Sequence, residues 1–237
     1  MSRSFQLSVQ QLRKTYGERV VLDVDGLMLK SGVSYALVGP NGSGKSTFLR
    51  ILGGVADQSS GFVDVTGDVS RDDLAVGYMP QKSYVFGFSV SRNVALALAG
   101  SGLARAEVKQ KVEAALKEVG MQDFADARGD GLSGGEAQRV ALARLLVQDL
   151  DVVLLDEPTA SMDIAGTLLV EEALARYRAR TGCLLLAATH APSQAHRISD
   201  EAVVLTSGRV VEQGATEQVL AHPESDEGRA FLSYWAV

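Results

Sequence analysis

Short apolar runs that alternate with glycine-rich or polar turns recur along the chain. Such runs predict buried strands, because a strand that is covered on both faces needs apolar side chains on both. Looser alternation on either side of a polar turn predicts one hairpin over 5–24 and another over 203–211. The buried strands are predicted at 34–38, 74–79, 152–157 and 184–189, and a further strand is predicted at 61–65.

Apolar residues at helical spacing predict the helices. In residues 91–119 one face is apolar and lysine and glutamate fill the others, which predicts an amphipathic helix. Its apolar positions are Val108, Val112, Leu116 and Val119. The other helices are predicted at 48–52, 136–147 and 216–235. Together with the strands, these helices indicate an α/β protein.

Composition limits the function. The 237 residues suffice for one large or two small domains, and 46% hydrophobic with 22% charged residues is ordinary for a globular protein. The net charge of −6 disfavours a nucleic-acid surface, which needs basic patches. The one cysteine, Cys183, excludes a disulfide framework and fits a reducing cytoplasm. Its apolar neighbours favour a small buried side chain over a reactive thiol.

Membrane and export signals are not found in the sequence. No apolar stretch approaches the roughly 18 residues of a membrane span, and the amino terminus lacks the apolar core of a signal peptide. The sequence therefore predicts a chain that is soluble by itself, and any role at a membrane would depend on a partner.

Residues 39–47, with the sequence GPNGSGKST, fill the P-loop pattern G-x-x-x-x-G-K-[ST]. They lie between a predicted strand and a predicted helix, and this setting favours phosphate binding over an ordinary glycine-rich turn. Glycines let backbone N–H groups approach a phosphate chain, and the helix that follows points its dipole at the same anion. Lys45 adds a positive charge, Ser46 offers a hydroxyl to Mg²⁺, and Thr47 can reach a more remote phosphate. The predicted nucleotide-binding residues here are Gly39, Pro40, Asn41, Gly42, Ser43, Gly44, Lys45, Ser46 and Thr47.

Two acidic residues, Asp156 and Glu157, end another buried strand. Adjacent carboxylates at such a place are unfavourable unless they meet a cation or a proton in transfer. Asp156 suits contact with Mg²⁺, and Glu157 suits the orientation of a water for attack. His190 follows strand 184–189 and should reach the same sheet edge, so we favour a functional histidine there over a surface one. The other two histidines are interpreted as ordinary residues.

Two further features lie outside the P-loop and the strand ends. Ser133, Gly134 and Gly135 precede helix 136–147, and they make a second helix amino terminus that can receive an anion. Tyr16 lies in a hairpin turn, where its ring could stack on an adenine or cover a sheet edge, as aromatic residues in such turns usually do.

These residues, taken in order, resemble the nucleotide-binding subunit of ATP-binding cassette (ABC) transporters over roughly residues 5–220. The resemblance implies a P-loop NTPase fold: an ABC ATPase cassette with a RecA-like core, an antiparallel β subdomain and a helical signature subdomain. The matching motifs are the A-loop Tyr16, Walker A at 39–47, the Q-loop Gln81, the signature Leu132–Glu136, Walker B at 152–156 followed by Glu157, the D-loop Ala160–Asp163 and the H-loop His190.

The resemblance also implies a division of the single ABC ATPase domain, 1–237. The catalytic core and β subdomain would take 1–80 and 151–222. The helical subdomain would take 82–150, and a short tail 223–237.

The resemblance further implies that two such subunits, a homodimer or a pair with a second cassette, meet head to tail. Each ATP would lie between the P-loop of one subunit and the signature helix of the other, where Ser133 completes the partner's site. The implied catalytic residues are Glu157, which polarises water, His190, which senses the γ-phosphate, and Lys45, which holds the β- and γ-phosphates. The implied Mg²⁺ ligands are Ser46, Gln81 and, in support, Asp156. Nucleotide contacts beyond the P-loop are implied for Tyr16, Gln81, Ser133, Gly134, Gly135, Glu136, Asp156 and Asp163.

Departures from the family pattern are small. Glu136 replaces a frequent glutamine, Met162 replaces a usual leucine, and 148–151 lacks a proline that often precedes Walker B. A cassette that binds ATP without hydrolysing it would be expected to lose Glu157, His190 or the signature serine. All three are present, so we expect an active ATPase.

Three classes of cassette compete: the ATPase of an importer, the ATPase of an exporter, and a soluble ABC protein such as an iron-sulfur assembly ATPase. No tandem cassette, coiled-coil insertion, zinc-binding cysteine set or fused membrane helix is found in the sequence. Tyr84, Phe86 and Phe88 follow Gln81, where the family places the groove for a membrane subunit. They favour docking of a transmembrane permease near residues 81–90, although the three rings could instead pack inside the helical subdomain.

The importer class implies separate permease subunits and a solute-binding protein. It also implies a peripheral position on the cytoplasmic side of the cell membrane. A compact form without a regulatory carboxyl-terminal domain resembles the cassettes of importers for small solutes or inorganic ions. We therefore expect a small cargo such as a tungstate-like oxyanion, although no single motif carries that expectation.

Overall fold

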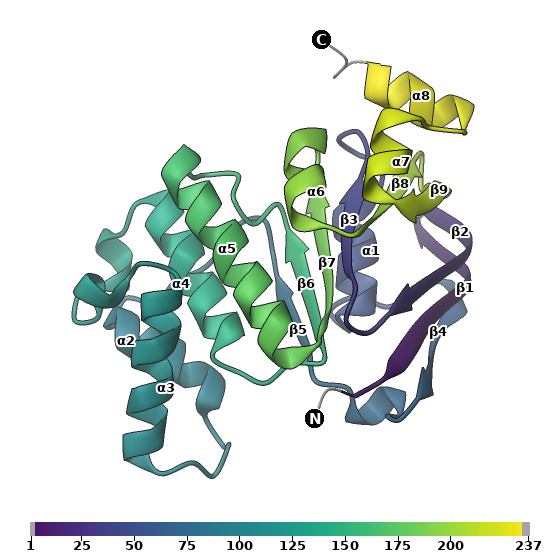
Figure 1. Cartoon of the computed structure of the whole chain (residues 1–237). Coiled ribbons are helices and arrows are strands. Elements are labelled where there is room, and N and C mark those ends of the chain that lie inside the picture. Colours follow the sequence, from purple (N-terminus) through teal and green to yellow (C-terminus); the bar gives the residue numbers. More distant parts are fainter. Residues whose placement is uncertain (1–2, 234–237) are drawn as a thin grey trace. The chain divides into compact units, whose positions relative to one another are not determined.

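The computed structural model describes residues 3–233 and divides them into two compact units (Figure 1). The first, here called the core unit, contains residues 3–78, 151–157 and 181–233. The second, the helical unit, contains residues 79–150 and 158–180. The division drawn from the sequence kept 158–180 with the core, whereas these residues group with the helical unit here.

A six-stranded sheet forms the centre of the core unit, in the order β5-β6-β7-β3-β8-β9 (Figure 1). The strands β6, β7, β3 and β8 run parallel. Every residue of β3, β6 and β7 is buried, as their continuous apolar runs predict. The strands are β3 (Ser34–Val38), β5 (Val76–Met79), β6 (Val152–Asp156), β7 (Leu184–Thr189), β8 (Glu201–Thr206) and β9 (Arg209–Ala215).

A separate three-stranded antiparallel sheet consists of β1 (Phe5–Tyr16), β2 (Arg19–Lys30) and β4 (Ser60–Gly67), in the order β2-β1-β4. Its inward residues share one hydrophobic core with the six-stranded sheet and with α1 (Lys45–Leu52). The hairpins predicted at the two places in the sequence are both confirmed, β1–β2 being the first and β8–β9 the second.

Three short helices cover the other face of the six-stranded sheet: α6 (Pro192–Ile198), α7 (Thr216–Ala221) and α8 (Asp226–Ser233). Phe231 and Leu232 of α8 are buried in this second cluster, against β8 and β9. The predicted helical tail is therefore two helices, and its end at Trp235 lies outside the described residues.

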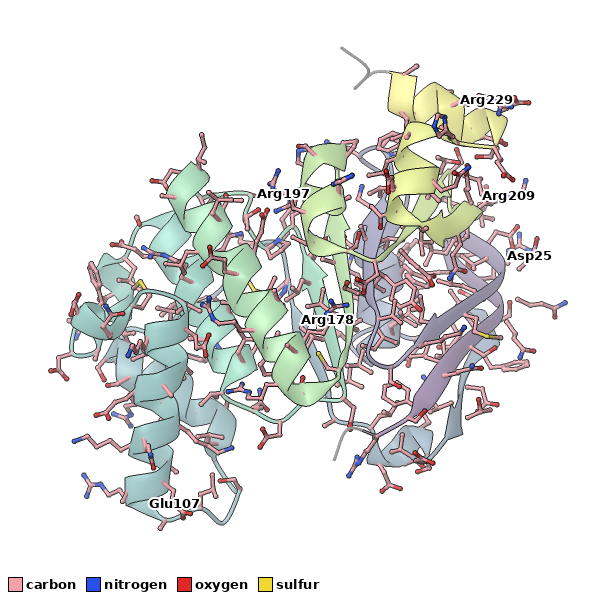
Figure 2. The ribbon with its side chains drawn as sticks, in the orientation of Figure 1. Asp25, Glu107, Arg178, Arg197, Arg209 and Arg229 are labelled. Carbon is pink, nitrogen blue, oxygen red and sulfur yellow. The ribbon has the colours of Figure 1, made fainter. Side chains whose placement is uncertain are left out.

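Polar contacts hold α8 to the sheet. Glu212 of β9 accepts hydrogen bonds from the backbone N–H groups of Glu224, at 2.9 Å, and Ser225, at 3.1 Å. On α8, Arg229 donates to the carbonyl oxygens of Pro223, at 3.0 Å, and Glu224, at 2.8 Å (Figure 2). These contacts fix the turn that leads into the helix.

The helical unit holds α2 (Val90–Ala95), α3 (Arg105–Glu118), α4 (Gly134–Leu146) and nearly all of α5 (Ile164–Thr181). The prediction of one helix over 91–119 is wrong. The chain leaves α2 through a 3-10 turn at 96–98, and two glycines with positive φ angles, Gly100 and Gly102, turn it before α3 begins. Glu107 then accepts the backbone N–H of Ala104 at 2.8 Å and so caps α3 (Figure 2).

No helix within residues 3–233 has both the length and the apolar character needed to cross a membrane.

Candidate functional site

The phosphate-binding loop 39–44 joins β3 to α1 and is held by the end of β8. A Cβ atom on Gly39 would lie 2.0 Å from the carbonyl oxygen of Leu205, so only glycine lets the loop pass this strand. The N–H of Gly208, in the β8–β9 turn, donates to the carbonyl oxygen of Ser43 at 2.9 Å. The loop is therefore supported from behind by the β8–β9 hairpin.

The side chain of Ser43 is an unusual feature of this loop. Its Oγ is buried and makes no hydrogen bond to any residue that the structure describes. A buried hydroxyl without a partner is unfavourable by roughly 1–3 kcal/mol. A phosphate oxygen of a bound nucleotide would supply the missing acceptor, so the loop fits the ligand that its sequence predicts.

Lys45 begins α1, and only 6% of its surface is exposed. Its Nζ donates to the carbonyl oxygens of Gly39, at 2.7 Å, and Pro40, at 3.0 Å. Burial lowers the pKa of Lys45 below its usual value. The nearby negative charges of Glu157 and Asp156 oppose this shift without cancelling it. Phosphate oxygens would give this ammonium stronger hydrogen bonds than the two neutral carbonyls do.

Asp156 ends β6 and is 4% exposed. Burial is the main cause that raises the pKa of this carboxyl, and a hydrogen bond from the Ser46 hydroxyl acts against it. No cluster of three or more histidine, cysteine or acidic side chains that could hold a metal ion is present in residues 3–233. One hydroxyl and one carboxylate fit Mg²⁺, because this ion keeps several waters and takes further ligands from substrate phosphates.

Tyr78 of β5 belongs to this site and was not singled out in the sequence. It lies on the strand next to β6, is half-buried, and interacts electrostatically with the side chain of Asp156. Burial and then the charge of Asp156 raise the pKa of Tyr78 to about 12, so its hydroxyl keeps its proton. No motif marks this tyrosine, because its contact depends on how β5 and β6 pair.

Glu157 follows β6 with a φ of +50°, which is rare for a residue with a side chain. Its N–H donates to the carbonyl oxygen of Ala188 in β7 at 3.0 Å. Its Oε1 lies 3.2 Å from Nδ1 of His190, which follows β7. The side chain of Glu157 is 13% exposed and that of His190 is 48% exposed. The two residues that were predicted at one sheet edge thus lie side by side.

Tyr16 ends β1, and 51% of its surface is exposed. The Nζ of Lys14 lies 5.0 Å from the centre of its ring. Across the hairpin Tyr16 pairs with Arg19, and Val21, two residues further on, lies against Gly44 of the phosphate-binding loop. The exposed ring therefore stands at the hairpin end that adjoins the loop, where it could stack on a nucleotide base.

In the helical unit, Ser133 caps the amino terminus of α4. Its Oγ accepts the N–H of Glu136 at 3.4 Å, and the Glu136 carboxylate accepts the N–H of Ser133 at 2.8 Å and its hydroxyl at 2.6 Å. These hydrogen bonds lower the pKa of Glu136. The exposed Ser133 and Gly134 leave the helix end open to an anion.

Asp163 and Gln81 also belong to the helical unit. Asp163 is exposed, and its Oδ1 accepts the N–H of Gly166 at 2.8 Å, which fixes the start of α5. Gln81 follows β5 and is exposed. The structure thus gathers the predicted site residues in two groups. The core unit holds Tyr16, the P-loop from Gly39 to Thr47, Asp156, Glu157 and His190, and the helical unit holds Gln81, Ser133 to Glu136 and Asp163.

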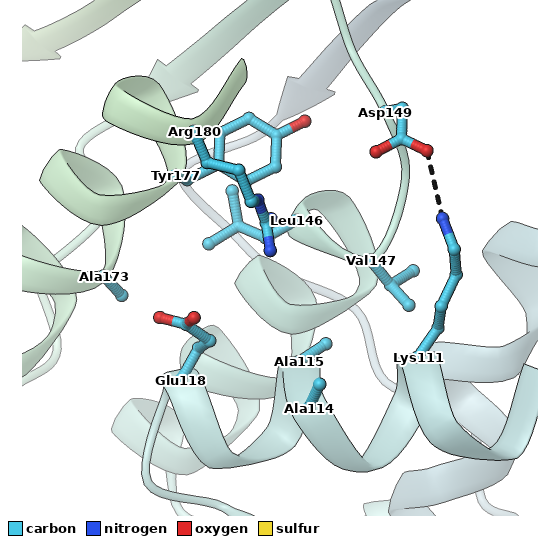
Figure 3. A pocket seen from close by; sticks show the side chains of 10 residues that line it. All are labelled: Lys111, Ala114, Ala115, Glu118, Leu146, Val147, Asp149, Ala173, Tyr177 and Arg180. Carbon is cyan, nitrogen blue, oxygen red and sulfur yellow. Dashed lines mark hydrogen bonds and ion pairs between the residues drawn. The ribbon is translucent and has the colours of Figure 1, made fainter.

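A cavity of about 160 Å³ within the helical unit is separate from these residues (Figure 3). Alanine and aliphatic side chains line it together with Glu118, Tyr177 and Arg180, and Lys111 and Asp149 form an ion pair of 3.0 Å at its side. The lining includes none of the predicted nucleotide-binding residues. The cavity is therefore not part of the candidate site.

A family model described as ABC transporter matches residues 22–160, a range that includes the phosphate-binding loop and the end of β6. The chain therefore belongs to the ABC transporter family. Within it, the chain is the ATP-binding subunit of a transporter, an ABC ATPase that binds and hydrolyses ATP. The α/β P-loop fold predicted from the sequence is confirmed.

Individual relatives agree with this class. The tungstate uptake system ATP-binding protein TupC of Peptoclostridium acidaminophilum is 38% identical over 208 residues, which cover 87% of this chain and 97% of that protein. The phosphate import ATP-binding protein PstB 2 of Natronomonas pharaonis is 37% identical over 245 residues, with coverage of 96% and 86%. The dimeric structure of the ATP-binding cassette MJ0796 bound to ADP and Pi has a TM-score of 0.79 at 26% identity, covering 89% of this chain and 98% of that one.

Proposed function

We propose that two copies of this ATPase, or one copy with a second cassette, close around two ATP molecules to drive the import of a small solute. The observation that carries this proposal is the unequal division of site residues. The core unit has the P-loop, the carboxylates Asp156 and Glu157, and His190. The helical unit has the amino terminus of α4, a helix end that can bind an anion. A second chain would bring its own helix end to the γ-phosphate, and the dimeric form of MJ0796 supports such a pairing.

Within that dimer each residue has a proposed role. Tyr16 stacks on the adenine, residues 39–47 wrap the phosphates, and Lys45 neutralises the β- and γ-phosphates. Ser46, Asp156 and Gln81 would hold Mg²⁺, which when bound neutralises the phosphate charge and orients the γ-phosphoryl group.

The residues after β6 and β7 are proposed to act on the attacking water. Glu157 accepts its proton, and His190, held 3.2 Å from that carboxylate, donates to the γ-phosphate. From the other chain, Ser133, Gly134, Gly135 and Glu136 surround the γ-phosphate, and Asp163 lies at the dimer contact.

The dimer is tested by sedimentation of Glu157→Gln with ATP and Mg²⁺. This variant should bind ATP without cutting it and should sediment as a dimer, while the same variant with ADP stays monomeric. Glu113→Gln, on the exposed face of α3, is the matched control and should hydrolyse ATP like the parent. A Glu157→Gln chain that binds ATP and remains monomeric at high concentration, with or without its membrane partner, contradicts the proposal.

A permease is the proposed membrane partner, and it would dock on Tyr84, Phe86 and Phe88. Tyr84 is 68% exposed and Phe86 39% exposed. The ring centres of Tyr84 and Phe86 lie 5.1 Å apart, and those of Phe86 and Phe88 lie 5.2 Å apart and stacked. The exposure of Tyr84 and Phe86, with Phe88 partly buried beside Phe86, supports the docking interpretation over burial inside the subdomain, and the row suits a short amphipathic helix.

The same substitution, phenylalanine to aspartate, is made at two positions to test the docking surface. Phe86→Asp should keep the ATPase activity of the isolated chain and lose co-purification with the proposed permease. Phe124→Asp, at a ring that is 37% exposed elsewhere in the helical unit, should keep both. Equal loss from both variants, or normal complex formation by Phe86→Asp, contradicts the assignment.

The cargo is proposed to be a tungstate-like oxyanion, supported by the relatives named for tungstate uptake and phosphate import. Such an import system would also include a solute-binding protein and would place this chain on the cytoplasmic side of the membrane. Uptake of labelled tungstate by cells whose gene carries Glu157→Gln tests the cargo, and we expect uptake to be lost. Normal uptake together with lost efflux of another solute would favour an exporter. Normal transport with failing iron-sulfur enzymes would favour the soluble class.

A further inference from the structure

Gln138 is a buried polar residue that neither the motifs nor the proposed chemistry uses. It lies one turn into α4, just after the signature Leu132–Glu136, and is 2% exposed. Its Oε1 accepts the backbone N–H of Ser161, in the D-loop Ala160–Asp163, at 3.2 Å. Both residues belong to the helical unit. A side chain of α4 thus reaches across to a loop 23 residues further along the chain.

The backbones of the two segments also approach closely. A Cβ atom on Gly135 would lie 2.9 Å from the carbonyl oxygen of Ser161 and 3.6 Å from Cγ of Met162. A Cβ atom on Gly134 would lie 3.5 Å from Cβ of Ser161. Gly135 therefore has to be glycine for the D-loop to pack here, because any side chain at this position would collide with the backbone of Ser161.

A glutamine is an unusual choice for this position if packing alone mattered. A buried amide is unfavourable unless its polar atoms are paired, and leucine would fill similar space without that penalty. The amide oxygen gains a role because the D-loop is neither helix nor strand at Ser161. Its backbone N–H has no partner in a strand ladder there, and the Gln138 side chain supplies the acceptor.

The rest of the D-loop is anchored on the same unit. The N–H of Met162 donates to the carbonyl oxygen of Thr159 at 3.1 Å, which closes a turn. Asp163 accepts the N–H of Gly166 at 2.8 Å and joins the loop to α5. Those two contacts are local in the sequence. Gln138 supplies a side-chain hydrogen bond that ties the loop to α4.

We propose that Gln138 is a positioning residue that holds the D-loop against the signature, so that Ser133 and Asp163 are presented to the partner chain as one surface. The inference rests on the proposed dimer, in which both segments meet the second chain. Without the Gln138 contact, the D-loop can move away from α4, and closure of the dimer must first bring it back. Hydrolysis then slows, while ATP binding at the P-loop is unchanged.

Gln138→Met tests this link, because methionine has similar length and no strong acceptor. In the nucleotide-free chain, amide hydrogen exchange of a peptide covering 160–163 should become faster by roughly fivefold or more, as expected for the loss of a partly buried hydrogen bond. The kcat for ATP should fall by a similar factor with KM unchanged.

Gln148→Met is the matched control, since Gln148 lies just past the other end of α4 and donates to the carbonyl oxygen of Arg144 at 3.2 Å. It should change neither readout. If exchange at 160–163 in Gln138→Met equals that of the parent, the link is refuted whatever the oligomeric state. Faster exchange with an unchanged kcat refutes its role in hydrolysis. If Gln138→Met does not fold, Gln138→Leu is measured in its place.

Discussion

The Oε1 atom of Glu157 lies 3.2 Å from Nδ1 of His190, at the ends of two neighbouring parallel strands. Neither side chain has to travel to meet the other, because the pairing of β6 with β7 places them together. Glu157 even adopts a positive φ at this point, an unfavourable geometry of roughly 1–3 kcal/mol that occurs at many functional sites. The pair is therefore expected to act as a unit on the γ-phosphate and the attacking water.

Non-additive kinetics should reveal that unit. Glu157→Gln and His190→Ala should each lower kcat by about 100-fold or more, which is the range for a lost acid or base group. The double variant should be little worse than the more damaging single one, because residues that act together do not contribute separately. His196→Ala, at an exposed histidine of α6, is the control and should keep the parental rate. Losses that multiply would show that the two residues act independently.

The Tyr78 hydroxyl is expected to matter for Mg²⁺. Tyr78→Phe keeps the ring and removes the hydroxyl that interacts with Asp156, so the carboxylate is held less firmly. We expect the Mg²⁺ concentration for half-maximal ATPase activity to rise about threefold to tenfold, equivalent to a hydrogen bond of roughly 1 kcal/mol.

A second tyrosine provides the control for this test. The hydroxyl of Tyr35 accepts the N–H of Lys30 at 2.9 Å and, within residues 3–233, makes no hydrogen bond to Asp156 or Glu157. Tyr35→Phe should lower the free energy of unfolding without changing the Mg²⁺ dependence. The same Mg²⁺ dependence in the parent and in Tyr78→Phe would exclude the proposed role of this hydroxyl.

Glu136 should weaken nucleotide capture by the dimer. Its carboxylate accepts the Ser133 hydroxyl, and its negative charge lies at the helix end that is proposed to meet the γ-phosphate. Glu136→Gln removes the charge and still offers an acceptor to the cap. We expect ATP-driven dimerisation at about a two- to tenfold lower ATP concentration, a difference of roughly 1 kcal/mol. Titration of dimer formation by light scattering, in a Glu157→Gln background, measures this change.

The cap itself supplies the control for Glu136. Glu136→Ala removes both the charge and the helix cap. The midpoint temperature of thermal unfolding should therefore fall for Glu136→Ala and stay unchanged for Glu136→Gln. An unchanged or higher ATP requirement for Glu136→Gln would mean that the carboxylate does not face the phosphates.

Glu212 should make stability depend on pH. Burial raises the pKa of this carboxyl, but the hydrogen bonds from Glu224 and Ser225 together lower it below 4.5. A carboxyl whose pKa is lower in the folded chain stabilises the fold above its unfolded pKa and loses that contribution as the pH falls through its folded pKa. At pH 7 we expect Glu212→Gln to cost about 1 kcal/mol of unfolding free energy. The difference from the parent should vanish at a pH below the folded pKa.

Denaturant unfolding across pH 3 to about 7 measures this effect. Glu217→Gln, at an exposed carboxyl of α7, should match the parent throughout. A stability difference for Glu212→Gln that stays constant across that range would assign it to packing instead of charge.

Much of the core unit could be predicted from the sequence, because β3, β6 and β7 are continuous apolar runs whose limits the structure reproduces closely. The long helix α5 was missed. Two of its apolar residues, Ile164 and Leu168, are 81% and 46% exposed. They lie off the buried face, so the apolar positions do not form the single stripe that helix prediction requires.

Some residues of the candidate site could likewise be proposed from the sequence, and others could not. The P-loop, Asp156, Glu157 and His190 could be proposed from the sequence because their chemistry follows directly from adjacent strands and turns. Tyr78 and Gln138 could not, since each owes its contact to a residue that only the tertiary structure brings near. Their side chains have no spacing or charge pattern that separates them from ordinary strand and helix residues.

Because Gly39 lies against the end of β8, the β8–β9 hairpin influences the shape of the phosphate-binding loop without touching the nucleotide itself. Leu205 leaves room for no side chain at Gly39, and Gly208 holds Ser43 in place. Lengthening or shifting the turn between β8 and β9 would therefore deform the cradle for the triphosphate from the rear. Insertions at that turn should be selected against as strictly as changes in the loop they support.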